Sequence, residues 1–189
     1  MLDGWHEFYG LLGTAAAALL ALLFVSASIG ASVLTYDRAG PTRTYLSPVV
    51  FHYSNILFLS LFALIPTQTP LIFGLTILIA AAGSFIYSIF IFVRLLTDGI
   101  ADFSDRIAYG AVPIASYAAG AVAACLLLTH TVAASLDVIA AASLILLLVN
   151  IRNAWDLLIA LARRATQVQR DRADAGTPPA PDSPKPPSP

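Results

Sequence analysis

Apolar residues fall into five long runs that are separated by short polar segments. The runs cover residues 7–34, 48–65, 70–94, 107–128 and 132–151. Each is close to the roughly 20 residues that an α-helix needs to cross about 30 Å of hydrocarbon. Because lipid offers the backbone no hydrogen-bond partners, every such run must be helical. The pattern therefore predicts an all-α, polytopic transmembrane bundle of five spans.

Two of these runs carry signals at their ends. The second run starts at Pro48 and is followed by Pro66. Proline is tolerated in the first turn of a helix and stops a helix just past its end, so we expect this span to lie between the two prolines. The first run is preceded by Asp3 and contains Glu7 instead of the basic residues that open a secretory signal. It is also too long for the apolar part of a signal, so we expect it to remain as a span.

The composition agrees with a membrane location. Of the 189 residues 58% are hydrophobic and 11% are charged, whereas soluble domains carry about 25% charged residues. The formal charge of −1 gives no reason to expect a nucleic-acid partner. Nine arginines against one lysine, with abundant alanine, are typical of a GC-rich bacterial genome. The single cysteine, Cys125, cannot form a disulfide within the chain.

Basic residues occur only in alternate segments between the runs. They follow the first, third and fifth runs: Arg38, Arg43, Arg94, Arg106, Arg152, Arg163, Arg164, Arg170, Arg172 and Lys185. With five spans these segments share one side of the membrane, which the positive-inside rule makes the cytoplasmic side. Four or six spans would break this separation. We therefore expect the N-terminus outside and the C-terminus inside, in a bacterial inner (cytoplasmic) membrane.

The fifth helix is expected to extend into the cytoplasm. Polar and apolar residues keep helical spacing over 150–164, and Arg152 and Asp156 stand four residues apart, as in a helical ion pair. Arg163 and Arg164 suit anionic lipid headgroups. Two interpretations remain open for these four charged residues, namely an anchor that stops transfer and a docking surface for a cytoplasmic partner.

The chain after residue 165 changes character. It is polar at first and then becomes rich in proline as far as residue 189. Such a segment has little apolar surface to bury, so it is expected to be disordered. The sequence thus predicts two parts, a helical bundle over 1–165 and a cytoplasmic tail over 166–189.

Four polar residues inside the apolar runs are candidates for function. His52 and Asn55 lie one helical turn apart in the second run, and Asn150 ends the fifth. Polar side chains at such depth turn toward neighbouring helices, so they either fasten helices together or line a proton relay or ligand pocket. Asp137 is the only acid well inside a run, and its alternatives are a functional carboxyl group and a carboxylate that water reaches.

No catalytic or metal-binding motif is apparent. His6, Glu7, His130 and Asp137 include ligand types for transition metals, but their order and spacing match no known site. The chain also contains no nucleophile motif and no phosphate-binding loop. We therefore expect no enzyme activity, no cofactor and no bound metal.

The opening residues resemble those of a known group of proteins. Gly4-Trp5-His6-Glu7-Phe8-Tyr9 precede a run rich in glycine and alanine that ends in Leu23-Phe24-Val25. This stretch is similar to the start of a group of uncharacterised bacterial inner-membrane proteins, which open with a Gly-Trp-His-acid-Phe-aromatic sequence. The resemblance implies no activity, but it draws attention to Trp5, His6 and Glu7 as a cluster on the outer face.

Small residues recur at four-residue spacing in two runs. One set is Gly10, Thr14 and Ala18, and the other is Ser116, Gly120 and Ala124. Such faces let helices approach closely, either within one chain or between chains of a homo-oligomer.

The sequence supports two functional hypotheses. The first is a non-enzymatic membrane protein that scaffolds or regulates a membrane or cytoplasmic partner through its last helix and tail. The alternative is a small transporter or channel subunit with a polar path through Asp137, His52 and Asn55.

Overall fold

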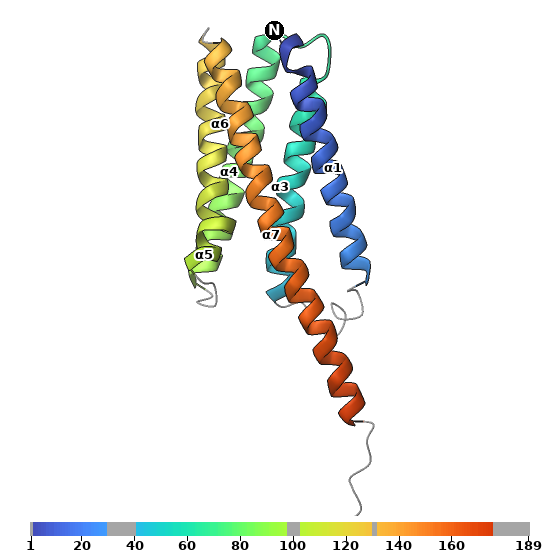
Figure 1. Cartoon of the computed structure of the whole chain (residues 1–189). Coiled ribbons are helices and arrows are strands. Elements are labelled where there is room, and N and C mark those ends of the chain that lie inside the picture. Colours follow the sequence, from blue (N-terminus) through green and yellow to red (C-terminus); the bar gives the residue numbers. More distant parts are fainter. Residues whose placement is uncertain (1, 30–40, 98–102, 130–131, 176–189) are drawn as a thin grey trace, which may run out of the picture.

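The structure, a computed structural model, describes residues 2–29, 41–97, 103–129 and 132–175. Five long helices run alternately up and down beside one another (Figure 1). They are α1 (His6–Ile29), α3 (Pro41–Ala63), α4 (Pro70–Thr97), α6 (Val112–Leu128) and α7 (Val132–Ala175). Three short elements, η1 (Asp3–Trp5), α5 (Phe103–Asp105) and η2 (Arg106–Ala111), precede α1 and α6. No strand occurs among the described residues.

The expected fold class is confirmed. Five helical stretches are long and apolar enough to cross a membrane: His6–Ser28, Leu46–Ala63, Pro70–Thr97, Phe103–Leu128 and Val132–Ala160. They coincide with the five apolar runs. The last residues expected in the first span, 30–34, lie outside the described residues.

The expected start of the second helix is wrong. α3 begins at Pro41, and Pro48 lies inside it with its ring fully buried. Pro41 is the proline that occupies the first turn, where the missing N–H group costs nothing. Pro48 removes one bond from the helix interior, a defect that transmembrane helices tolerate when neighbouring groups pack around it. At the other end the expectation holds, since α3 stops at Ala63, three residues before Pro66.

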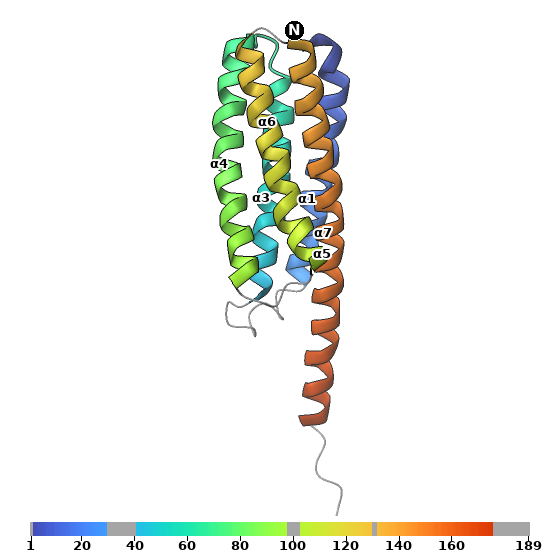
Figure 2. The same cartoon turned by 90° about the vertical axis from the view of Figure 1, so that its left-hand side faces the viewer.

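The helices pack in an order that differs from their order in the chain. α4 packs along α6, α6 packs on α7, and α3 packs on both α1 and α7 (Figures 1 and 2). The consecutive helices α3 and α4 meet at few points. α7 therefore closes the bundle by joining the α1–α3 pair to the α4–α6 pair.

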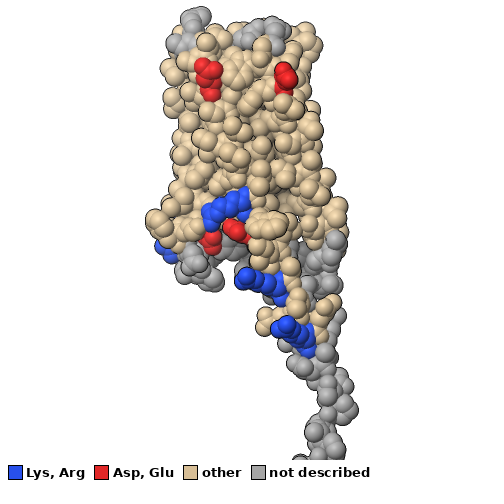
Figure 3. Space-filling model, viewed as in Figure 1, with Lys and Arg blue, Asp and Glu red and all other residues tan. Residues whose placement is uncertain are grey.

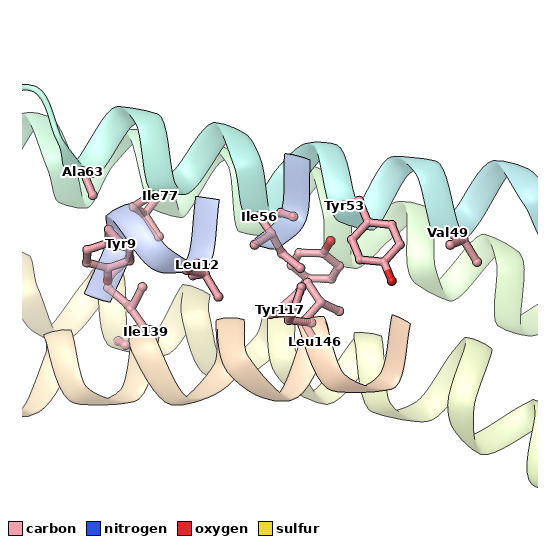
Figure 4. Close-up of a cluster of buried hydrophobic side chains, with 14 of the residues drawn as sticks. Tyr9, Leu12, Val49, Tyr53, Ile56, Ala63, Ile77, Tyr117, Ile139 and Leu146 are labelled. Atoms are coloured by element: carbon pink, nitrogen blue, oxygen red, sulfur yellow. The ribbon is translucent and has the colours of Figure 1, made fainter. Parts of the chain in front are cut away.

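Large side chains fill the interior and also cover the outside. Tyr9, Tyr53, Ile56 and Ile139 are almost fully buried. Figure 4 shows Tyr9 beside Ile139, with Ile56 and Tyr53 further along the bundle. Other large apolar residues point outward from every long helix, including Leu22, Leu61, Ile79, Val122 and Leu148. A bundle that is apolar on both sides is compatible with contact to a lipid bilayer.

Close approach of helices depends on particular glycines. A Cβ atom at Gly13 of α1 would lie 2.9 Å from the Cβ of Ser60 on α3. A Cβ atom at Gly110 would lie 2.2 Å from Cδ2 of Phe92 on α4.

The two sets of small residues at four-residue spacing lie in different environments. Ser116, Gly120 and Ala124 are buried in the bundle, whereas Thr14 and Ala18 are exposed and Gly10 has open space beside it.

The close contact between Gly110 and Phe92 predicts the effect of adding one methyl group. Gly110→Ala should lower the free energy of unfolding by about 1–3 kcal/mol, because the new methyl group displaces the Phe92 ring. Gly10→Ala is the matched control, because no atom lies within 4 Å of its added Cβ. Titration with SDS, followed by circular dichroism, measures both variants. Equal stability of the two would contradict the packing of η2 against α4.

Candidate functional site

A histidine and a tyrosine form the centre of a polar network inside the bundle. Nδ1 of His52 on α3 and the hydroxyl of Tyr117 on α6 are joined by a 2.8 Å hydrogen bond. Both side chains are buried. The bond therefore ties α3 to α6. These two helices are otherwise connected mainly through α7 and α4, each of which contacts both of them.

Asn55 and Ser84 extend this network to α4. The Ser84 hydroxyl donates to Oδ1 of Asn55 over 3.2 Å and also interacts with the Tyr117 hydroxyl. Nδ2 of Asn55 donates to the Phe51 carbonyl one turn earlier in α3. Four residues thus link three helices, and His52 and Asn55 lie on one side of α3, as their spacing predicts. The interpretation that they fasten α3 to its neighbours matches these contacts.

The aromatic rings of Phe51, Tyr87 and Tyr117 lie close to His52. The Phe51 and Tyr87 ring centroids lie 4.2 Å apart, and the His52 ring lies 5.5 Å from Tyr117 and 6.5 Å from Tyr87. The Tyr87 hydroxyl lies 3.3 Å from the Ser47 hydroxyl, which is exposed. These rings separate the imidazole from the surface of the bundle.

A cavity of about 60 Å³ lies next to the network. Its wall comes from α3, α4, α6 and α7, with Asn55, Ser116, Tyr117 and Ser143 as the polar residues. Figure 4 shows Tyr117 and Ile56 lying toward Leu146, which is another wall residue. The interior of the bundle thus combines a polar network with space for a small molecule.

A second polar group fixes α7 to η2. Nδ2 of Asn153 donates to the Ala108 carbonyl over 3.1 Å, and the Tyr109 hydroxyl donates to the Asn153 carbonyl over 2.8 Å. η2 is a π-helix, a rare form that often marks a functional position. Sequence analysis missed Asn153, although its three-residue spacing from Asn150 placed both on one face of α7.

Asn150 lies one turn away from Asn153 on α7. Its Nδ2 donates to the Leu146 carbonyl over 2.8 Å, within the same helix. The Oδ1 atoms of both asparagines are buried without a hydrogen-bond partner among the described residues. Asn150 is therefore a buried polar residue, as expected, but its hydrogen bond to Leu146 lies within one helix and does not join two.

Asp137 does not meet the polar network. It lies near the start of α7 with its side chain exposed on the outside of the bundle. His52 and Asn55 face the interior, so the expected polar path through all three residues is not present in the described part of the structure. The reason is the rotation of α7, which turns Ser135, Leu136 and Ile139 inward and Asp137 outward.

The expected outer cluster is partly a packing feature. Trp5 packs against Phe8, with ring centroids 5.7 Å apart, and against Tyr9 at 6.2 Å. His6 is half-buried and Glu7 is exposed. Within the described ranges no three His, Cys, Asp or Glu side chains gather where a metal could bind, and His130 lies outside those ranges.

Arginines mark the end of the bundle at which α7 leaves it (Figure 3). We call this end, with Arg94, Arg106 and Arg152, the basic end. Nη2 of Arg152 donates to the Ser104 hydroxyl over 2.6 Å and lies 3.8 Å from Oδ2 of Asp156, which is the pair that the four-residue spacing predicts. Arg163 is exposed further along α7. The side chain of Arg164 lies outside the described part.

No family model matches this chain, and no curated protein or solved structure matches it either. The interpretation of its function therefore depends on its own geometry.

The His52–Tyr117 bond predicts a measurable coupling. Tyr117→Phe leaves the buried imidazole without its partner and should cost about 1–3 kcal/mol of unfolding free energy. In a double-mutant cycle with His52→Ala, the two losses should fail to add by about 0.6–2 kcal/mol. SDS titration of the two single variants and the double variant gives this coupling.

Ser54→Ala is the control for that cycle. Its exposed hydroxyl bonds only to the Val50 carbonyl of its own helix, so its removal should change stability by less than about 0.5 kcal/mol. Simple additivity of His52→Ala and Tyr117→Phe would contradict the proposed link between α3 and α6.

Proposed function

We propose that the protein is a non-enzymatic scaffold or regulator, and that a membrane or cytoplasmic partner binds the part of α7 that projects beyond the bundle. The observation that supports this most is the length of α7. Its 44 residues form one continuous helix of about 66 Å, which is twice what a bilayer requires. Figures 1 and 2 show its C-terminal part leaving the bundle alone.

The projecting helix is longer than the sequence led us to expect. α7 continues to Ala175, so the expected boundary at residue 165 falls inside it. Residues 161–175 contain neither proline nor glycine and are rich in alanine, arginine and glutamine, which favour helix. Gly176 is the first residue that favours a helix end. The expected disorder of the remaining tail lies outside the described residues.

Contacts at the basic end hold this helix in a fixed direction. Arg152 bonds to Ser104, and Asn153 exchanges two hydrogen bonds with η2. All three anchors belong to the segment where α7 leaves the bundle. The bundle therefore sets where the projecting part stands, which is what a scaffold requires.

The projecting surface suits an acidic partner. From Arg152 to Ala175 the chain has five arginines and three aspartates. Arg163 and Arg170 are exposed, and Trp155 is 64% exposed near the bundle. Arginine and tryptophan are enriched at the centres of protein interfaces.

A homo-oligomer is a further candidate assembly, since Thr14 and Ala18 on α1 present small exposed side chains.

The orientation belongs to the same proposal. We place the basic end and the projecting helix in the cytoplasm of a bacterium, and the N-terminus outside its inner membrane. The distribution of Lys and Arg along the chain supports this orientation. The alternative of a small transporter or channel subunit has less support, because Asp137 faces away from the His52 network.

Photocrosslinking in native membranes tests the partner site. A photoreactive amino acid at Arg163 or Gln167, both exposed on the projecting part, should give a discrete protein adduct. The same amino acid at Leu144 or Leu148, exposed on the bundle, is the matched control and should give lipid adducts. Equal adduct patterns at the two pairs of positions would contradict the proposal.

Charge reversal tests the chemistry of the partner. Arg163→Glu together with Arg170→Glu should reduce the adduct formed from position 167 about tenfold, because each lost ionic contact is worth about 0.2–1 kcal/mol and each new repulsion costs a similar amount. The double Lys variant at these positions keeps the charge and should retain most of the adduct. An unchanged yield after reversal would exclude an acidic partner.

A further inference from the structure

We propose that the cavity inside the bundle binds a small neutral molecule that carries one hydroxyl group and a short alkyl chain. The cavity lies between α3, α4, α6 and α7 and next to the His52–Tyr117–Ser84–Asn55 network. This inference is separate from the proposed partner site on α7.

The charge of the ligand follows from the wall of the cavity. None of the wall residues is an acid, a base or a histidine, and the other wall residues apart from Asn55, Ser116, Tyr117 and Ser143 are apolar or glycine. An ion would therefore lose its water without gaining an opposite charge, at a cost of several kcal/mol. The ligand must be neutral.

One hydroxyl on the wall is available to the ligand. Ser116 is 7% exposed, and its hydroxyl makes no hydrogen bond to any residue that the structure describes. The other polar groups already have partners, since Ser143 donates to the Ile139 carbonyl and Asn55 bonds to Phe51 and Ser84. A buried hydroxyl without a partner costs about 1–3 kcal/mol, so a ligand hydroxyl that bonds to Ser116 recovers this energy.

The volume and the apolar wall set the rest of the ligand. A cavity of about 60 Å³ is less than half the roughly 150 Å³ that holds benzene in an engineered protein. Ile77, Ile139 and Leu146 are apolar wall residues and suit an alkyl chain of two or three carbons. A short primary alcohol such as 1-propanol has this size and polarity.

The ligand can reach the cavity through the membrane. Phe58 is a wall residue, yet it is 47% exposed on the outside of the bundle. It lies on α3, which meets α4 at few points. Short alcohols dissolve in bilayers, so they can enter beside Phe58 without crossing the basic end.

Photolabelling of the whole protein in nanodiscs tests the proposal. The label is a short primary alcohol that carries a diazirine, and mass spectrometry locates its adducts. Adducts on the cavity wall, for example at Tyr117 or Asn55, that decrease when 1-propanol is added would support the site. Adducts confined to lipid-facing residues, or wall adducts that 1-propanol does not reduce, would overturn it and leave the cavity to water.

Three variants sharpen the result. Ala81→Leu fills the cavity from α4 and should remove the wall adducts, whereas Ala82→Leu, one position further and exposed, should leave them unchanged. Ser116→Ala keeps the shape and should raise the propanol concentration for half-protection about fivefold, as expected for one lost hydrogen bond. Equal labelling of Ala81→Leu and Ala82→Leu would also overturn the proposal.

Discussion

The structure depends on one constraint, which is that the interior of a bilayer offers no hydrogen-bond partners. The backbone meets this constraint by forming five long helices, in which each residue bonds within its own segment. Several buried polar side chains meet it by bonding to one another, as His52 does with Tyr117 and Asn55 with Ser84. The outer surface is left to leucine, isoleucine, valine and phenylalanine, which lipid can cover.

The same constraint explains what could be predicted from the sequence. The five spans were predictable because twenty consecutive apolar residues leave the backbone no alternative. The shared face of His52 and Asn55 was predictable from their spacing of one turn, and their inward direction from their polarity within an apolar run. Both the spans and the direction of these two side chains follow from the residues of a single segment. They could therefore be predicted without knowing which helices lie beside it.

Other features depend on how the helices are rotated against one another. Pro48 is a tolerated interior proline because the bundle packs around its ring. Gly13, and not Gly10, touches α3, and Asp137 points outward because Ile139 and Leu136 point inward. The π-helix η2 is held by Asn153 on α7 and by Phe92 on α4. The partners of Gly13 and of η2 are far away in sequence, and the rotation of α7 depends on the helices that it packs against. The pattern of one segment could therefore not reveal these features.

The two ends of α7 differ in what they contribute. Its first part closes the bundle and supplies Ser143 and Leu146 to the cavity, while its last part projects alone from the basic end. Arg152 and Asn153 stand between the two parts and bond to Ser104 and Ala108. A partner on the projecting part and a ligand in the cavity would thus act on the same helix.

The most direct measurement of this arrangement is the sidedness of the two ends of the bundle. In a Cys125→Ser background, a cysteine at Gly4 or at Gln167 is treated with a membrane-impermeant maleimide, in intact and in permeabilised cells. Five crossings with the basic end inside predict labelling of position 4 in intact cells and of position 167 only after permeabilisation. Labelling of both positions, or of neither, in intact cells would contradict the five-span bundle.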